Sequence, residues 1–284
     1  MEKILMIFGV FILLVCLEIA RELHCFRIRR YEIHVPAHKE GEIKIMFLSD
    51  LHGKTYGKEN IQLLEAMKKE HPDLILSGGD ILTRGEERTD AIALSFLKEA
   101  SKIAPLYIAN GNHEQKLRLE TEKYGTRYKD YVSKLEKAGL KVIENGSVDV
   151  EVKGLPITIS GMELPVECYE LFHQRELTQK AMEERIGKPD SSRYQILLAH
   201  NPIYMEQYAA WGANLTLCGH LHGGIVRLPI VGGIVTPQAR LFPKYSGDQY
   251  IEGGHCGIVS RGLGTHTVNI RLFNMAEVVM ITLI

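Results

Sequence analysis

Five short polar motifs along this chain each follow an apolar, strand-like run, and this pattern limits the possible folds more than any other feature. The motifs are Ser49-Asp50-Leu51-His52, Gly78-Gly79-Asp80, Gly111-Asn112-His113-Glu114, Ala199-His200-Asn201 and Gly219-His220-Leu221-His222. In open α/β sheets, ligand sites form beyond the carboxyl ends of the strands. Because all five motifs occupy that position, we expect side chains far apart in sequence to converge on one site.

Segments with helical spacing alternate with apolar strands in the first half of the chain. The predicted helices cover residues 60–70, 89–100, 128–138, 171–186 and 202–210. The predicted strands cover residues 43–48, 74–76, 106–109, 141–143, 148–152, 157–160, 195–199, 215–218, 256–260 and 278–283. Residues 31–41 are interpreted as a connector or a first strand. The alternation indicates an α/β architecture with partly parallel pairing, and the later strands indicate a second, more mixed sheet.

Composition and charge are those of a globular protein, and they do not favour binding to nucleic acid. The 284 residues carry a net charge of −1 and only 7% aromatic side chains, so we expect no nucleic-acid partner. The length allows one or two domains. The five cysteines are scattered, odd in number and without a CxxC pair, which favours unlinked thiols over a disulfide framework or a zinc–thiolate site.

The N-terminal segment differs from the rest of the chain. Residues 4–17 carry no charge, and extending the run to residue 20 brings it near the short end of the roughly 17–25 residues that span a bilayer. A cleaved signal peptide lacks a convincing small-x-small site, and a lipoprotein signal is disfavoured because Val15 precedes Cys16. An uncleaved anchor fits best. We therefore divide the chain into residues 1–30, an anchor or signal-like segment with a basic flank, and a domain over residues 31–284.

The charges beside the anchor predict a location at the cell membrane. Lys3 flanks one end of the apolar run, and four arginines flank the other, namely Arg21, Arg27, Arg29 and Arg30. The positive-inside rule leans toward a cytoplasmic domain, although the side of the membrane stays open. The basic stretch could also lie on anionic head groups.

The first two motifs supply carboxylates and a histidine suited to divalent metal. Asp50 and His52 are two apart, so in an extended chain both side chains point the same way, and carboxylate and imidazole suit Mn, Fe or Zn. Alone, Asp50 is better explained as a strand-end residue that caps a turn, and Asp80 as an ordinary turn aspartate. Beside the other motifs, Asp80 becomes the natural bridging ligand, because a carboxylate has two oxygens to share between two cations.

The remaining motifs add an amide and four histidines. Asn112 offers a neutral carbonyl oxygen, with a left-handed turn residue as the alternative, and His113 can steady charge or deliver a proton near pH 7. Glu114 is either a supporting residue or a helix-start carboxylate. His200 has an alternative as a satisfied core histidine. The pair His220 and His222 is harder to explain that way, because glycines flank it on both sides.

As an ordered set, DLH, GGD, GNHE, AHN and GHLHGG between Asp50 and Gly224 resemble the calcineurin-like metallophosphoesterases. Two later segments are similar to a bacterial subgroup with an N-terminal membrane or export segment, the YkuE/YaeI-like phosphodiesterases. They are Leu241-Phe242-Pro243-Lys244-Tyr245 and Ser260-Arg261-Gly262-Leu263-Gly264-Thr265. Export signals in that subgroup are often twin-arginine, and this chain has no Arg-Arg before its apolar run.

The resemblance implies a four-layer α/β/β/α sandwich, built from two mixed sheets flanked by helices, with two divalent metal ions. One ion would take Asp50, His52, Asp80 and His222. The other would take Asp80, Asn112, His200 and His220. His113 would face the substrate, so Asp80 and His113 are the expected catalytic residues. Mn, Fe and Zn all suit these ligands, and the sequence does not choose among them.

Two-metal physics predicts the reaction. Ions about 3.5–4 Å apart hold a shared water, lower its pKa and clamp the phosphoryl oxygens, so that a bridging hydroxide attacks phosphorus. His113 would offset developing charge and could protonate the leaving group. Arg suits bidentate phosphate contact, and four cationic residues after the last motif are candidates for substrate binding, with solvated surface cations as the alternative. They are Arg227, Lys244, Arg261 and His266.

The predicted function is hydrolysis of a phosphodiester or pyrophosphate bond in a membrane- or envelope-associated substrate. One alternative is a UDP-2,3-diacylglucosamine pyrophosphatase-type lipid enzyme, because relatives with this fold do that chemistry. An alternative of another class is a catalytically inactive metal-binding scaffold, against which His113 argues, since a scaffold needs only the ligands. Charge, few aromatics and the anchor disfavour a nuclease. The oligomeric state is open.

Overall fold

The computed structural model describes residues 1–36, 41–169, 176–228, 231–236, 241–265 and 268–284. Within them, the helices are α1 (Glu2–His24), η1 (Lys58–Asn60), α2 (Ile61–Lys69), α3 (Arg88–Ala100), α4 (Asn112–Leu119), α5 (Thr121–Tyr124), α6 (Arg127–Lys137), η2 (Val166–Tyr169), α7 (Gln179–Ile186), η3 (Pro202–Tyr204) and α8 (Met205–Trp211). The strands are β1 (Phe26–Ile33), β2 (Ile43–Leu48), β3 (Leu74–Ser77), β4 (Leu106–Ala109), β5 (Lys141–Ile143), β6 (Gly146–Val152), β7 (Leu155–Met162), β8 (Tyr194–Ala199), β9 (Leu215–Cys218), β10 (Val226–Leu228), β11 (Gly232–Val235), β12 (Asp248–Glu252), β13 (His255–Val259) and β14 (Ala276–Leu283).

Two mixed sheets form the centre of the domain. The first has the order β1-β14-β2-β3-β4-β5, in which β2, β3, β4 and β5 run parallel. The second has the order β12-β13-β9-β8-β7-β6, in which β13, β9, β8 and β7 run parallel. Central strands such as β2 and β3 carry apolar side chains on both faces, as expected where helices cover one face and another sheet covers the other.

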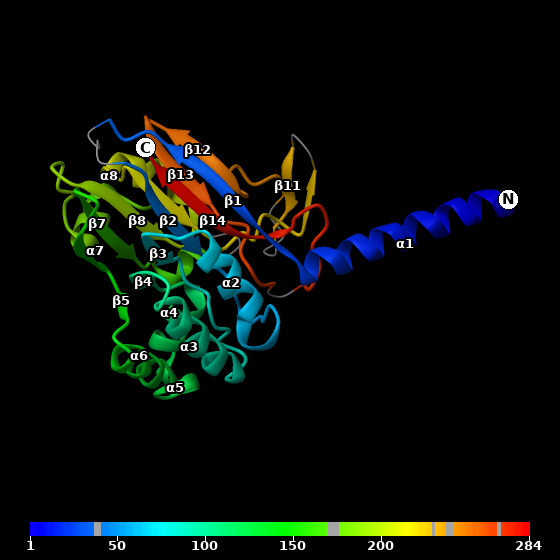
Figure 1. The fold of residues 1–284 in the computed structure, drawn as a ribbon, viewed down its shortest axis with the longest axis horizontal. Coiled ribbons are helices and arrows are strands. Elements are labelled where there is room, and N and C mark those ends of the chain that lie inside the picture. Colours follow the sequence, from blue (N-terminus) through cyan, green and yellow to red (C-terminus); the bar gives the residue numbers. More distant parts are fainter. Residues whose placement is uncertain (37–40, 170–175, 229–230, 237–240, 266–267) are drawn as a thin grey trace.

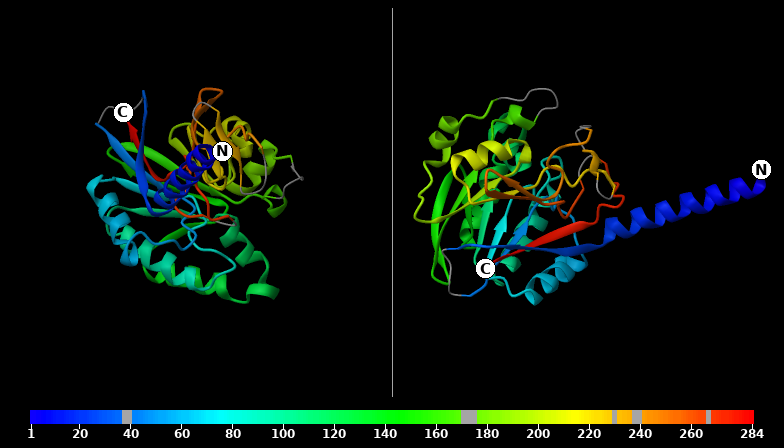
Figure 2. Two further views of the ribbon diagram at one scale, coloured as in Figure 1. Left: turned by 90° about the vertical axis from the view of Figure 1, so that its right-hand side faces the viewer. Right: turned by 90° about the horizontal axis from the view of Figure 1, so that it is seen from above.

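Three buried apolar clusters lie between four successive layers. One packs α2, α3, α4 and α6 against the first sheet, one lies between the two sheets, and one packs α7 and α8 against the second sheet. Figures 1 and 2 show α2, α3 and α6 on one side of the sheets and α7 and α8 on the other. The predicted α/β/β/α sandwich of two mixed sheets is therefore confirmed.

The first sheet's outer strand begins earlier than the sequence predicted. Strand β1 begins at Phe26, opposite Ala276 of β14, whereas the sequence placed residues 27–30 in a basic flank. Its arginines are neutralised by acidic residues that lie far away in sequence: Arg27 contacts Glu277, and Arg30 contacts Glu70. Local pattern hides such a strand, because its charges are balanced only by long-range contacts. The predicted helix over 171–186 is seen from Gln179 onward, and residues 171–175 lie outside the described residues.

The carboxyl ends of β2, β3, β4, β8 and β9 form what we call the motif end of the domain. Strand β2 ends at the motif end, and β14 runs antiparallel to it, so β14 begins there. Strand β1 runs parallel to β14 and therefore also begins at the motif end. Only Cys25 separates α1 from β1, so α1 leaves from the motif end (Figure 1). Helix α1 is long and apolar enough to cross a membrane, as a signal sequence also can be, and none of its apolar span is buried.

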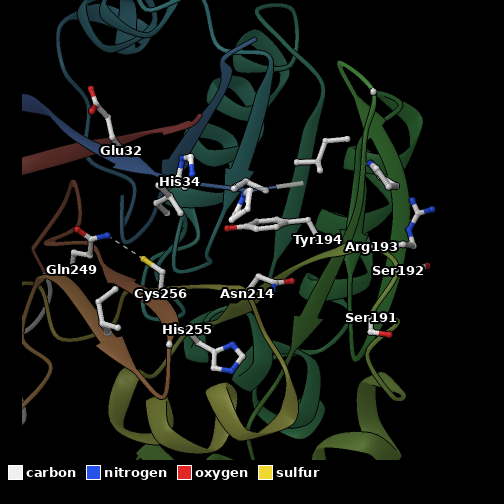
Figure 3. Close-up of a pocket in the computed structure, with 18 residues that line it drawn as sticks. Glu32, His34, Ser191, Ser192, Arg193, Tyr194, Asn214, Gln249, His255 and Cys256 are labelled. Carbon is white, nitrogen blue, oxygen red and sulfur yellow. Dashed lines mark hydrogen bonds between the residues drawn. The ribbon is translucent and has the colours of Figure 1, made fainter. Parts of the chain in front are cut away.

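A cavity of about 850 Å³ lies at the opposite end of the domain, where the parallel strands begin. His34, Tyr194 and Cys256 line it, as Figure 3 shows. None of the residues in the five polar motifs lines this cavity. It is therefore separate from the motif end, where the strands end and the candidate ligands gather.

Candidate metal centre

Every metal ligand predicted from the sequence lies at the motif end. Asp50 and His52 follow β2, Asp80 follows β3, and Asn112 opens α4 just after β4. His200 follows β8, and both His220 and His222 follow β9. All seven are at least nine-tenths buried. The two sheets therefore each contribute ligands to one cluster, as parallel strands with adjacent carboxyl ends require.

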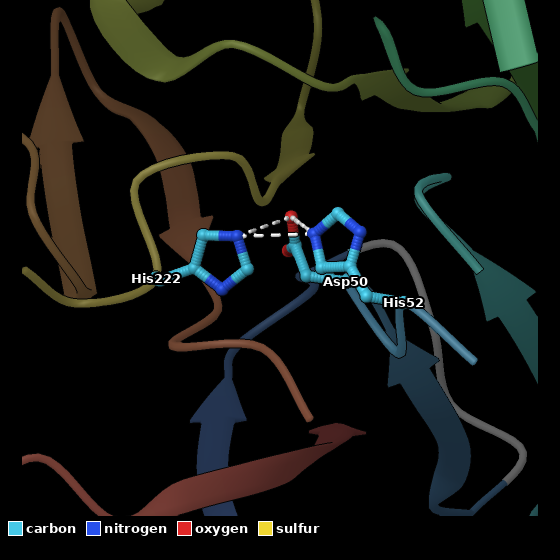
Figure 4. Close-up of side chains that lie close together, drawn as sticks. All are labelled: Asp50, His52 and His222. Carbon is cyan, nitrogen blue, oxygen red and sulfur yellow. Dashed lines mark hydrogen bonds and ion pairs between the residues drawn. The ribbon is translucent and has the colours of Figure 1, made fainter. Parts of the chain in front are cut away.

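The first group of ligand atoms surrounds Asp50. His222 Nε2 lies 3.5 Å and His52 Nε2 lies 4.0 Å from Asp50 Oδ1. The two imidazole Nε2 atoms are 3.2 Å apart. Figure 4 shows both rings turned toward the carboxylate. Three ligand atoms within 4.8 Å of one another are suited to hold one ion.

The second group surrounds Asp80. His200 Nε2 lies 3.1 Å from Asp80 Oδ2, and His220 completes a set of ligand atoms within 4.8 Å of one another. The same Oδ2 atom lies 3.9 Å from His52 Nε2, a ligand of the first group. Asp80 Oδ1 instead accepts a hydrogen bond of 2.8 Å from the His113 backbone N–H. One oxygen of Asp80, rather than both, therefore lies between the two groups.

The polar atoms of the cluster fit divalent metal. The buried side-chain oxygen Oδ1 of Asn112 has no hydrogen-bond partner among the described residues, and a buried, unpaired amide oxygen is costly unless a ligand occupies it. His200 Nδ1 lies 2.7 Å from Gly78 O, and His222 Nδ1 lies 3.2 Å from Gly264 O. A ring N–H donated to a carbonyl leaves the Nε2 lone pair free to face a metal.

Burial and charge divide the cluster into one ionised pair and neutral imidazoles. Burial alone would raise the pKa of Asp80, but His200 and His113 hold it well below its ordinary value. Burial opposes the charged form of His200, yet Asp80 and Asp50 outweigh it and raise the pKa of His200 to about 10. Burial lowers the pKa of His52, which therefore stays neutral. In the metal-free protein a proton on His200 thus offsets carboxylate charge that cations would otherwise neutralise.

Five of the seven candidate ligands have left-handed rather than extended backbone, which corrects the geometry assumed from the sequence. Asp50 and His52 have φ angles of 54° and 50°, and Asp80, His220 and His222 have φ angles of 54°, 71° and 51°. Such left-handed residues cost about 1–3 kcal/mol each and persist only where the surroundings hold them. Asp50 and His52 converge because each strand ends in a tight turn, not because alternate side chains of a strand share a face.

Glu114 holds the Asp80 turn against the start of α4. Its Oε2 accepts hydrogen bonds from Asp80 N at 2.9 Å and Gly111 N at 3.0 Å. Its Oε1 accepts from Ile81 N at 2.9 Å and Leu82 N at 3.3 Å. The carboxylate is only 3% exposed. Glu114 is therefore both a helix-start carboxylate and a support of the Asp80 turn, so both interpretations that the sequence left open apply.

His113 lies beside the cluster with a defined tautomer. The Arg84 backbone N–H donates to His113 Nδ1 at 3.1 Å, so the ring proton of the neutral form is on Nε2. Its ring centre is 4.9 Å from that of His52. His113 thus presents an N–H donor next to the metal ligands, which is the arrangement expected of a residue that faces substrate.

The late glycine-rich segment supports the Asp50 turn. Gly264 N donates to Asp50 O at 2.5 Å, and Leu263 N donates to Ser49 O at 3.1 Å. Gly262 has a φ of 68°, and a Cβ there would lie 2.7 Å from the Cβ of Asp50. This segment, which carried part of the family resemblance, therefore holds the turn of the candidate ligand Asp50 through backbone contacts.

Sequence reasoning missed two residues that hold this region together. The fully buried Arg271 donates to Arg261 O at 2.8 Å and to Gly264 O at 2.7 Å. The Asn274 side chain donates to His222 O at 2.7 Å and also to Gly224 O. Neither residue belongs to a distinctive local pattern. Only the folded chain shows that they fix the loop that carries His222.

The predicted substrate-binding cations have different surroundings. Arg227 and Arg261 are buried, and both form ion pairs of 2.7 Å with Asp248. Lys244 is exposed and pairs with Glu206 and Glu252. His266 lies outside the described residues. A role for these four in substrate binding stays a prediction.

Comparison with known proteins agrees with this geometry. A sequence model described as calcineurin-like phosphoesterase matches residues 43–224. The chain is 28% identical to the uncharacterized metallophosphoesterase YkuE of Bacillus subtilis, over 84% of this chain and 78% of that protein. It is 25% identical to the phosphodiesterase YaeI of Escherichia coli, over 91% of this chain and 88% of that protein.

A solved structure shares the fold. The sulfate thiohydrolase SoxB of Thermus thermophilus aligns with a TM-score of 0.50 at 12% identity, over 81% of this chain and 53% of SoxB. At that identity the likeness concerns the fold alone. Together with the matched residues and the ligand cluster, these findings identify the chain. It belongs to the calcineurin-like phosphoesterase family, as a hydrolase of phosphoester bonds that uses two divalent metal ions.

Proposed function

We propose that this hydrolase cleaves a phosphodiester or pyrophosphate bond in a substrate held at a membrane. The observation that carries the proposal is the position of His113 beside the candidate metal ligands, with its Nδ1 accepting a hydrogen bond from the Arg84 backbone N–H. The name of the relative YaeI, a phosphodiesterase, agrees with a diester substrate. Helix α1 agrees with a membrane location.

Two groups of ligand atoms support the predicted ligand sets. Asp50, His52, Asp80 and His222 would hold one ion, and a second set would hold the other, namely Asp80, Asn112, His200 and His220. When bound, such a metal pair supplies an activated water at neutral pH and neutralises the phosphoryl oxygens. The chain's own part is to keep the ligand atoms in place, which Glu114 and the glycine-rich segment do.

His113 then acts on the oxygens of the reacting phosphate. Because the Arg84 backbone N–H occupies Nδ1, Nε2 can donate a hydrogen bond where negative charge develops. The same proton can pass to the leaving oxygen of an ester. An enzyme needs this residue, whereas a metal-binding scaffold needs only the ligands. His113 is therefore the residue that favours catalysis over the scaffold alternative.

Arg84 is a further candidate for contact with the substrate phosphate. Its backbone contacts the His113 ring, its side chain is half-buried, and its guanidinium forms no ion pair within the parts of the chain that the structure describes. By contrast, Arg227 and Arg261 share the carboxylate of Asp248. An unpaired guanidinium can bind a phosphate in bidentate fashion. We propose that Arg84 contributes to substrate affinity.

The proposal is tested with the full chain in detergent, stripped of metal with EDTA and then supplied with Mn²⁺. The two substrates are bis(p-nitrophenyl) phosphate, a diester, and p-nitrophenyl phosphate, a monoester. We expect metal-dependent turnover with a higher kcat/KM for the diester. A clear preference for the monoester would refute the choice of substrate class. Absence of turnover in a metal-loaded protein would favour the scaffold.

A further inference from the structure

Four short segments at the motif end form a small backbone ladder with an exposed apolar surface. Phe242 N donates to Ile234 O of β11 at 2.8 Å, β11 pairs with β10, and Leu272 N donates to Ile225 O at 3.2 Å. Residues 241–242, β11, β10 and 270–273 are thus hydrogen-bonded side by side. We call them, together with Val231 between the two strands, the apolar ladder.

The apolar ladder exposes large hydrophobic side chains that the rest of the domain leaves uncovered. The exposed fractions are 43% for Leu228, 55% for Val231, 68% for Leu241, 64% for Phe242, 41% for Ile270 and 53% for Phe273. Phe242 and Phe273 also have φ angles of 46° and 55°, a conformation that bulky side chains rarely adopt. Strained backbone that presents aromatic rings to the exterior indicates a contact surface, rather than the single exposed hydrophobic side chains that are normal on a protein surface.

Helix α1 is fixed directly beside this ladder. Glu22, in the last turn of α1, is 3% exposed and accepts a hydrogen bond of 2.7 Å from Asn274 N, the residue after Phe273. Lys54 donates to Leu23 O. Phe26 packs edge-on against Tyr56 with ring centres 4.8 Å apart. The end of α1 is therefore part of the folded domain, and no flexible linker separates the two.

The length of α1 sets where the domain meets a bilayer. The apolar run ends near Ala20, and the five residues from there to Cys25 rise about 8 Å along a helix. The head-group layer on each side of a bilayer is of similar thickness, roughly 5–8 Å. If α1 spans the membrane, the motif end lies at the head groups. Amphipathic protein surfaces at that depth bury apolar side chains about 5–10 Å into the boundary.

We propose that the apolar ladder rests on the bilayer that α1 crosses, so that the metal centre works at the surface of that bilayer. The Asn274 side chain binds His222 O while its backbone binds Glu22, which joins α1 to a metal ligand through one residue. A small depression lined by His222, Ile225 and Ile270 connects the ligand to the ladder. The substrate is then a phosphoester in the head-group region, a part of the inference that rests on the proposed function.

Tryptophan fluorescence tests whether the apolar ladder contacts lipid when the full chain is reconstituted into liposomes. Phe242→Trp and Phe273→Trp place reporters on the ladder. Ile251→Trp is the matched control, because Ile251 is 65% exposed and lines the cavity at the opposite end. The single native tryptophan, Trp211, is 2% exposed and gives the background in the wild type. The lipids carry bromine on their acyl chains, which quenches tryptophan at the membrane boundary.

We expect brominated lipid to reduce the emission of Trp at positions 242 and 273 but not at position 251. If brominated lipid changed the emission equally at all three positions, the proposal would be overturned. A blue-shifted emission at 242 and 273 that brominated lipid does not quench would also overturn it, because it would indicate burial against a second copy of the chain.

Activity measurements separate this inference from the proposed function. The double variant Leu241→Ser/Phe242→Ser removes two apolar contacts outside the metal centre. We expect kcat/KM to fall about tenfold or more on a phospholipid diester in vesicles and to stay unchanged on bis(p-nitrophenyl) phosphate. An equal loss of kcat/KM on both substrates, or no loss on either, would contradict the proposal that the apolar ladder rests on the bilayer. Failure of the wild type on the soluble diester would instead refute the proposed function, while the quenching result stands by itself.

Discussion

Replacing Glu114 by alanine should destabilise the protein because it leaves buried backbone donors without an acceptor. Glu114 accepts four hydrogen bonds from backbone N–H groups, three of them at 2.9–3.0 Å and the fourth at 3.3 Å. An unsatisfied buried donor costs about 1–3 kcal/mol. Water can enter the space left by the side chain, so we use the low end of this range. The expected loss in unfolding free energy is about 4 kcal/mol.

The assay is thermal unfolding of the full chain in detergent with EDTA, so that metal binding does not contribute. A loss of 1 kcal/mol lowers Tm by roughly 2–4 °C in a domain of this size, which predicts a decrease of about 8–16 °C. Glu122→Ala is the matched control, because Glu122 is an exposed glutamate on α5. If Glu114→Ala melts within 2 °C or so of the wild type, the four hydrogen bonds do not support the Asp80 turn, and this reasoning is wrong.

Three further predictions concern the metal, the substrate and pH. Asn274→Asp puts a carboxylate against His222 O, and metal affinity should fall about 10–100-fold in a chelator-competition titration. Arg84→Ala should raise KM for the diester about tenfold with metal content unchanged, whereas Arg88→Ala, at an exposed arginine, should change neither. Two aspartates raise the pKa of His200 from 6.5 to about 10, so its stabilising proton is fully effective below about pH 6.5 and is lost as pH rises toward 10. Tm in EDTA should therefore fall, and metal affinity should rise, across that range.

Each of these has a contrary result. Unchanged chelator competition in Asn274→Asp would show that the His222 loop does not need the amide. Equal KM values for Arg84→Ala and Arg88→Ala would remove Arg84 from the substrate site. A Tm in EDTA that rises between pH 7 and 9 would mean that His200 is neutral in the metal-free protein.

The position of the candidate ligands could be predicted because each lies where an apolar strand stops. Strands such as β2 and β9 are recognisable from a few buried residues, and the topology of parallel sheets then brings their carboxyl ends together. Asp50 and Asp80 became candidates only beside the other motifs, and the resemblance then implied the ligand sets. The strand pattern indicated two sheets with strands that are covered on both faces, whereas the four layers were implied by the family resemblance.

The supports of the site could not be predicted, because they depend on contacts between distant segments. The left-handed backbone at Asp50 and His222 is stabilised by the glycine-rich segment and Asn274, which lie some fifty to two hundred residues away in sequence. Arg227 and Arg261 looked like free cations because their shared partner, Asp248, is visible only in the folded chain. A local stretch of sequence shows residue types and the spacing of apolar residues, but it does not show which distant residues pair.

The most direct test of the account is the behaviour of His113→Ala, measured as diester turnover and as metal content of the same preparation. His113 lies beside the ligands but is not assigned to either ion. We predict a decrease in kcat of about 10²–10⁴-fold with two metal ions per chain retained. His71→Ala, at an exposed histidine, should match the wild type in both. Wild-type turnover in His113→Ala, or loss of its metal, would contradict the role given to this residue.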